Sequence, residues 1–397
     1  MSMLPDSHTV RLAALLVVCA IMLVGWANSS ATSTGQAVGV VSICPTPTIQ
    51  VRGAAFSPGG LILTTFDRAN LWVYNIDANS RYPLPETFPC GGNCHLSPDF
   101  RWITYPNAFT NAYSKMRLDG TERTSLIPYA SEVQWWSTET LLVWTPGHEA
   151  YLQPEAGGER DVLDVRGVVM VQPGGRWGLH VAQQGDFFVR SLLNLETREQ
   201  NDLPQERVWL GLDTTYFNAA AWSPDGTWLA YVAPGMFDLN AQISGGELFG
   251  IRPGDALPTQ WTTLTGIYGA VRINGRAVGE LSWSPDSTRL AFWVMPLSGA
   301  DPEQNTGQAV IHLLDVDTGT LTAYCGYSTD QHTPNPPRLV WSPDGTHLAF
   351  GGRVAGDTRG YLLLALNTLD GVFTELSVGV YPALGNPDVV AWGLPPQ

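Results

Sequence analysis

The stretch AAWSPDGTWLAYV, residues 220–232, decides the fold, because near copies of it return twice further along the chain. They are LSWSPDSTRLAFWV at 281–294 and LVWSPDGTHLAFGG at 339–352. In each copy an apolar strand ends at tryptophan, proline fixes φ at the first corner of a turn, aspartate bonds nearby backbone, and an alternating strand follows. We therefore expect buried rings at Trp222, Trp283 and Trp341, and turn-bracing carboxylates at Asp225, Asp286 and Asp344.

Weaker copies of the same unit fill the first half of the chain. They read AAFSPGGLILTT (54–65), CHLSPDFRWITY (94–105), VQWWSTETLLVW (133–144) and VMVQPGGRWGLHV (169–181). The serine or its equivalent stands at 57, 97, 137, 172, 223, 284 and 342, so the period is 35 to 61 residues. Each copy is followed by two more short strands around a polar turn, as in IHLLDVDTGTLTAY at 311–324. This pattern predicts an all-β fold, a single β-propeller with four-stranded antiparallel blades.

The number of blades depends on the last strand, VVAWGLP at 389–395. In the preferred arrangement seven blades close, and this tail docks at the seam between the first and last blades. In the alternative, the tail joins strands from 37–43 and 48–51 to form an eighth blade. Both arrangements bring the two ends of the chain together and remove exposed sheet edges.

The composition excludes some partners. The chain has 397 residues, 44% of them hydrophobic, which is ample for a globular core. Its formal charge is −15, with Asp+Glu 36 against Lys+Arg 21. No electrostatic footprint for nucleic acid or an anionic membrane surface is present.

The N-terminus is typical of a targeting segment, since Arg11 precedes an apolar run over residues 12–26. As a helix the run would span roughly 22 Å, short of the ~30 Å hydrocarbon core, which favours a cleavable signal peptide over a membrane anchor. We expect a signal peptide or membrane anchor over 1–31 and the propeller over 52–397. Residues 32–51 are expected to be a linker that could also contribute strands to the closure of the ring. The expected location is extracytoplasmic: periplasmic, cell-surface or secreted.

Four cysteines lie beyond the apolar run, and an even count in an exported chain allows disulfides. The glycines between Cys90 and Cys94 allow a small disulfide loop there, which would leave Cys44 to pair with Cys325. A metal site at Cys90, Cys94 and His95 would need further ligands, and no second ligand pair is in sight. We expect no metal and no cofactor.

The Trp-Ser-Pro-Asp-Gly turn followed by Leu-Ala-Phe or Leu-Ala-Tyr resembles the WD-repeat-like Pro-Asp repeat of TolB-type propellers and of peptidase propellers. The resemblance covers residues 52–395 as an architecture and implies a β-propeller fold, but it says little about function. Peptidase propellers are attached to a hydrolase domain with a Gly-x-Ser-x-Gly elbow, and this chain contains no such motif. Catalysis is not expected from the residues that the repeat shares.

Long loops indicate where binding would occur. The second-to-third strand loops at 235–246 and 296–307 and the blade-to-blade connections at 205–218, 266–277 and 326–337 all belong to one face, over blades four to seven. Their candidate binding residues are Trp209, Tyr216, Tyr268, Arg272, Arg276, Tyr327, Asp330 and His332.

The sequence contains no recognisable active-site motif, its N-terminus is typical of export, and its long loops gather on one face. Together these features predict a non-enzymatic exported propeller that binds a protein or peptide partner. One alternative is a glycan-binding or glycoside-processing propeller that uses its central channel. Another is a scaffold anchored in the membrane through residues 12–26.

Overall fold

The structure is a computed structural model. It describes residues 39–45, 49–53, 56–65, 71–85, 87, 90, 93–107, 109–185, 187–203, 208–209, 219–234, 245–274, 281–297, 308–329, 336–378 and 388–396, with only the backbone at 187, 208–209 and 234. The chain divides into two units, Met1–Ala37 and Val38–Gln397, and every described residue lies in the second. The predicted signal or anchor segment lies outside the described residues.

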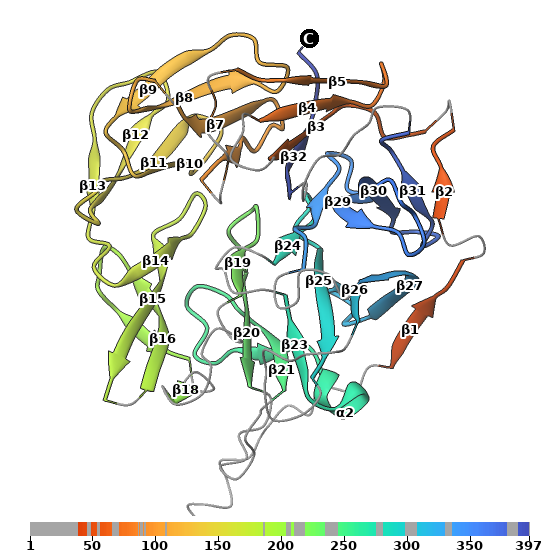
Figure 1. The fold of residues 1–397 in the computed structure, drawn as a ribbon. Coiled ribbons are helices and arrows are strands. Elements are labelled where there is room, and N and C mark those ends of the chain that lie inside the picture. The colour runs from red at the N-terminus through yellow and green to blue at the C-terminus, as the bar shows by residue number, and fades with distance from the viewer. Residues whose placement is uncertain are drawn as a thin grey trace, which may run out of the picture. The chain divides into compact units, whose positions relative to one another are not determined.

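The second unit is a seven-bladed β-propeller, in which seven sheets surround a common axis (Figure 1). Each blade is built on four antiparallel strand positions, which confirms the predicted all-β fold. Among the described residues the single helix is α2 (Leu264–Tyr268), which lies in the connection between blades 5 and 6.

Blades 2 to 5 are each built on four consecutive strands, which run in chain order from the axis outward, and blade 4 has one additional strand. Blade 2 contains β6 (His95–Leu96), β7 (Trp102–Pro106), β8 (Ala112–Arg117) and β9 (Thr124–Pro128). Blade 3 contains β10 (Glu132–Trp135), β11 (Thr140–Trp144), β12 (Ala150–Pro154) and β13 (Asp161–Leu163). Blade 4 contains β14 (Val168–Val171), β15 (Trp177–Gln184), β16 (Phe187–Asn194) and β17 (Gln200–Asp202), with β18 (Val208–Trp209) also paired to β16. Blade 5 contains β19 (Ala220–Trp222), β20 (Leu229–Pro234), β21 (Gly246–Ile251) and β22 (Thr259–Gln260).

Blades 6 and 7 each carry a fifth, outermost strand from the N-terminal part of the chain. In blade 6, β23 (Val271–Ile273) and β24 (Ser282–Trp283) share the inner position, followed by β25 (Arg289–Pro296), β26 (Ala309–Asp315) and β27 (Leu321–Thr329). Blade 7 contains β28 (Val340–Trp341), β29 (His347–Arg353), β30 (Tyr361–Asn367) and β31 (Phe373–Glu375). The outermost strands are β1 (Val40–Ile43) and β2 (Ile49–Val51), which pair in parallel with β27 and β31.

Blade 1 closes the ring with strands from the two ends of the propeller. Its inner strand is β32 (Asp388–Gly393), which pairs with β3 (Leu61–Thr65), and β4 (Trp72–Asn75) and β5 (Ser80–Pro83) follow outward. The preferred seven-blade closure is confirmed. The eight-blade alternative is wrong, because β1 and β2 have found free edges on blades 6 and 7 rather than pairing with the tail.

The turn between the first and second strands has the same hydrogen bonds in each strong repeat. Ser284 Oγ donates to Asp286 Oδ1 at 2.5 Å, and this carboxylate also accepts from the Thr288 amide and hydroxyl. Ser284 Oγ in turn accepts from the Arg289 amide at 2.9 Å. Equivalent bonds join Ser223 to Asp225 and Ser342 to Asp344. The recurrent aspartates therefore brace their own turns.

The tryptophans that end the three strong inner strands, Trp222, Trp283 and Trp341, are buried, and the last two form hydrogen bonds to the preceding blade. Trp283 Nε1 donates to the Ala221 carbonyl of blade 5 at 3.1 Å, and Trp341 Nε1 donates to the Ser282 carbonyl of blade 6 at 2.9 Å. A buried aromatic ring removes ~150–250 Å² from water. These rings therefore stabilise the contacts between neighbouring blades and are not available to a ligand.

Candidate functional site

The candidate site lies on the face that carries the second-to-third strand loops and the blade-to-blade connections, which we call the rim face. The opposite face carries the Ser-Pro-Asp turns, and we call it the turn face. Much of the predicted long-loop region lies outside the described residues. This applies to the candidate residues Tyr216, Arg276, Asp330 and His332.

Tyr268 is the last residue of α2; it lies on the rim face and is 37% exposed. Its hydroxyl donates to His312 Nε2 at 2.9 Å, while His312 Nδ1 donates to the Val310 carbonyl at 3.0 Å. Burial of His312 in β26 lowers its pKa to about 4, against a smaller opposing effect of the Val310 carbonyl. A neutral imidazole fits both bonds, because it donates through one nitrogen and accepts through the other.

Helix α2 is fixed at its start by a buried carboxylate from the neighbouring sheet. Glu247 of β21 accepts hydrogen bonds from the Thr262 hydroxyl and the Leu264 and Thr265 amides, each at 2.7 Å. These amides are among those that a helix start leaves without a partner inside the helix. Glu247 thus places Ile267 and Tyr268, which are 42% and 37% exposed, at the surface.

Two other predicted binding residues are not at the surface. The interval 266–277, expected to be a loop, contains the end of α2 and all of β23, and Arg272 lies on β23 with 1% of its surface exposed. Its Nε donates to the Asn274 carbonyl at 3.2 Å. Arg272 is therefore an interior residue of blade 6 and not, as expected, an exposed residue of a rim loop.

Tyr327 requires the same correction. It lies on β27, is 5% exposed, and its hydroxyl donates to the Arg353 carbonyl at 3.2 Å. Its ring packs against Trp293, Phe350 and Phe373. Trp209 is the second residue of β18, at the edge of blade 4, and only its backbone is described.

The rim face also carries two exposed aromatic residues that loop length does not reveal. Phe109, in the short loop between β7 and β8, is 77% exposed, and Tyr129, between blades 2 and 3, is 71% exposed. Their segments are adjacent, because the Tyr129 amide donates to the Asn111 carbonyl at 3.0 Å. Tyr129 has φ of 58°, a region that bulky residues seldom adopt. The sequence feature that could have identified Phe109 and Tyr129 is an aromatic residue in a very short connection between strands.

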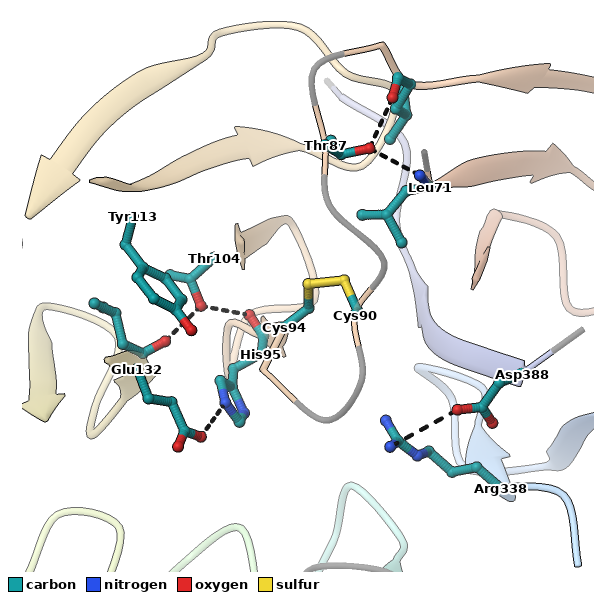
Figure 2. Close-up of a disulfide and its surroundings, with 12 residues drawn as sticks. Leu71, Thr87, Cys90, Cys94, His95, Thr104, Tyr113, Glu132, Arg338 and Asp388 are labelled. Carbon is teal, nitrogen blue, oxygen red and sulfur yellow. Dashed lines mark hydrogen bonds and ion pairs between the residues drawn. A yellow bond between two sulfur atoms is a disulfide. The ribbon is translucent and has the colours of Figure 1, made fainter. Parts of the chain in front are cut away.

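Charged residues gather where the inner strands begin, at the rim-face end of the axis (Figure 2). His95 Nε2 and Glu132 Oε1 are 2.7 Å apart and join blade 2 to blade 3. Burial alone would raise the pKa of Glu132, but the hydrogen bond and charge of His95 lower it overall. Arg338 and Asp388 face each other at 3.8 Å and join blade 7 to blade 1. Each of these two carboxylates is therefore paired with a basic side chain.

The Cys90–Cys94 disulfide lies beside this group, directly before β6 (Figure 2). Both cysteines are buried in the core between blades 1 and 2. Cys44 and Cys325 form the other disulfide, between β1 and β27, with their Cα atoms 5.0 Å apart. The structure thus contains the pairing that the CGGNC loop suggested.

Within the part of the chain that the structure describes, no group of three or more His, Cys, Asp or Glu residues could hold a metal ion. In the same residues, no helix has the length and apolar character needed to cross a membrane.

No protein-family model and no curated protein sequence matches the chain. Solved structures similar to it include TolB from Acinetobacter baumannii, at 14% identity and a TM-score of 0.42 over 91% of this chain and 89% of that chain. An oligogalacturonate lyase from Vibrio parahaemolyticus matches at 13% identity and a TM-score of 0.46, over 80% and 84% of the two chains. Hydrazine synthase from Kuenenia stuttgartiensis matches at 12% and 0.39, over 71% and 77%.

Likenesses this weak do not indicate a shared activity or partner. The chain's own strand order establishes it as a seven-bladed β-propeller, and TolB is among the solved structures that it resembles.

Proposed function

We propose that this protein is an exported, non-enzymatic β-propeller that binds a protein or peptide partner through its rim face. One observation carries the proposal. Among the described residues, the three exposed aromatic side chains are Phe109, Tyr129 and Tyr268, and all three lie on the rim face. Aromatic residues are enriched in protein interfaces, where a large apolar ring gains most from burial.

The turn face exposes no comparable aromatic side chains among the described residues. Its recurrent tryptophans are buried between blades, and its exposed large apolar residues among those described are the isolated leucines Leu257 and Leu369. Single exposed leucines are normal on soluble proteins. The contrast between the two faces supports the rim face as the binding surface.

Export is supported by the two disulfides, Cys44–Cys325 and Cys90–Cys94, since such bridges persist in oxidising compartments. Sequencing the N-terminus of the mature protein tests this part. A start after the apolar run, between residues 27 and 39, is expected. A mature chain that retains residues 12–26 would instead support the membrane-anchored form.

The binding proposal is tested by comparing two double variants of the immobilised protein. Phe109→Ala/Tyr129→Ala changes the rim face, and Leu257→Ala/Leu369→Ala changes equally exposed residues of the turn face. Proteins captured from the native envelope fraction are identified and quantified by mass spectrometry. Losing two interface aromatic rings costs about 3 kcal/mol of binding free energy. The rim variant should therefore bind the partner with at least about 100-fold lower affinity, and the turn-face variant with unchanged affinity. Equal retention by both variants would overturn the proposal.

A further inference from the structure

Residues 40–45 and 49–52 lie on the outside of the ring, against blades 6 and 7 and, through Arg52, against blade 1 (Figure 1), and we call these two segments the strap. Strand β1 pairs with β27 from Val40↔Leu321 to Ile43↔Tyr324, and β2 pairs with β31 from Ile49↔Phe373 to Val51↔Glu375. The Arg52 amide donates to the Glu375 carbonyl at 3.2 Å, and its guanidinium donates to Tyr74 of blade 1 at 2.8 Å. The strap therefore contacts three consecutive blades.

The strap is held weakly by its side chains. None of its seven strand residues is fully buried, and Val41 and Val51 are 52% and 65% exposed. Val40, Ile43 and Ile49 pack against the blade cores only in part. Pairing covers four residues in β1 and three in β2. By contrast, four of the six residues of β32, the inner closing strand, are buried.

The Cys44–Cys325 disulfide secures this weakly packed strap to blade 6. Both cysteines are exposed, whereas Cys90 and Cys94 are 1% and 6% exposed. Thiol–disulfide exchange requires access of a thiolate to sulfur, so an external dithiol reaches the first bridge and is excluded from the second. The two bridges of this protein thus differ in accessibility.

We propose that the strap is a redox-controlled latch: reduction of Cys44–Cys325 releases β1 and β2 from blades 6 and 7, while β32 keeps the ring closed. The reductant is a dithiol. One of its thiolates attacks a sulfur of the bridge, forming a mixed disulfide and releasing the other cysteine as a thiolate. The second thiol of the reductant then closes its own disulfide and releases the first cysteine. Two electrons and two protons pass to the protein, and Cys44 and Cys325 become thiols.

Release changes the outer surface of the propeller. The outer edges of β27 and β31 lose their parallel partners and present backbone amide and carbonyl groups to solvent. A free strand edge of this kind recognises an extended peptide segment. The latch lies on the outer edges of blades 6 and 7, whereas Phe109 and Tyr129 belong to blades 2 and 3, so the latch and the rim-face proposal are tested by different residues.

Hydrogen exchange on the full-length protein, with and without dithiothreitol, tests the latch. The state of each cysteine is established in parallel by alkylation and peptide mass mapping. We expect Cys44 and Cys325 to be alkylated while Cys90 and Cys94 remain paired. Amides of β1 and β2 should then exchange at least about tenfold faster, and amides of β32 should not change. The variant Cys44→Ser/Cys325→Ser should show the fast exchange without reductant, and should it not fold, the reduced wild-type protein carries the test.

Three results would overturn the proposal. The first is unchanged exchange of β1 and β2 once Cys44 and Cys325 are shown to be thiols. The second is reduction of the buried Cys90–Cys94 bridge as readily as the exposed one. The third is an equal rise in exchange of β32, which would mean that the strap and the inner closure open together.

Discussion

Replacing Trp392 with alanine should weaken the closure of the ring more than any other single change in blade 1. Trp392 lies on β32, is fully buried, and packs with Ile62 and Tyr74 of blade 1 and Ala349 of blade 7. Its indole Nε1 donates to the Gly59 carbonyl at 3.1 Å, which joins the last strand to the first turn. The substitution removes both the ring and this bond.

The expected loss follows from the two contributions. Truncating a fully buried tryptophan to alanine costs about 4 kcal/mol, including the cavity left behind. Leaving the Gly59 carbonyl without its donor adds about 1 kcal/mol. Domains are stable by about 5–15 kcal/mol, so a total of about 4–5 kcal/mol is a large part of the free energy of unfolding. Trp392→Phe keeps most of the ring and should cost about 2 kcal/mol.

The free energy of unfolding is measured by urea denaturation followed by far-ultraviolet circular dichroism, with the slope m compared between variants. The matched control is Trp72→Ala, which removes the same side chain from a half-buried position of β4 in the same blade. A loss for Trp392→Ala of less than about 1 kcal/mol, or one no greater than that of Trp72→Ala, would refute the closing role of β32.

Two further predictions concern a buried histidine and a turn. Burial lowers the pKa of His312 to about 4 from 6.5, so the unfolded chain binds more protons between these values. The free energy of unfolding should therefore fall by up to about 3 kcal/mol as pH drops from 6.5 towards 4, and urea midpoints across this range should change less in His312→Phe. Asp286→Ala removes a carboxylate that accepts from Ser284 and Thr288 and should cost about 1 kcal/mol, whereas the exposed control Asp317→Ala should cost less than half of that; equal costs would contradict the bracing role.

The repeat could be predicted from the sequence because the residues that form each turn lie close together in the chain. Ser284 and Asp286 are two positions apart, and their bond forms whatever the neighbouring blades do. In the three strong copies proline fixes φ at the first corner, and Gly226, Ser287 and Gly345 adopt a similar positive φ at the end of the turn. The fold class and the position of each first turn could therefore be predicted from short windows.

Pairings between distant segments could not be predicted in the same way. Strand β32 pairs with β3 across more than 300 residues, and β1 and β2 are short apolar segments that carry no mark of their partners. A segment of three or four residues fits any free edge of suitable twist. The choice between seven and eight blades was thus decided by tertiary packing.

The candidate site shows the same limit. The polar residues that follow Tyr327 predict a loop, yet Trp293, Phe350 and Phe373 from three other strands enclose its ring. The long loops were expected to carry the exposed aromatic residues, yet Phe109, the most exposed of the described ones, lies in a very short loop. Exposure depends on neighbours that a linear sequence does not identify.

The position of β32 in blade 1 has a consequence for the order in which the protein is made. Translation delivers β3, β4 and β5 before strands β6 to β31 and β32 after them, so the first sheet lacks its inner strand throughout that interval. Until β32 arrives, the apolar edge of β3 is unprotected, which is the state in which chains aggregate or require a chaperone. The closed ring can therefore form only once β32 is free to pair with β3.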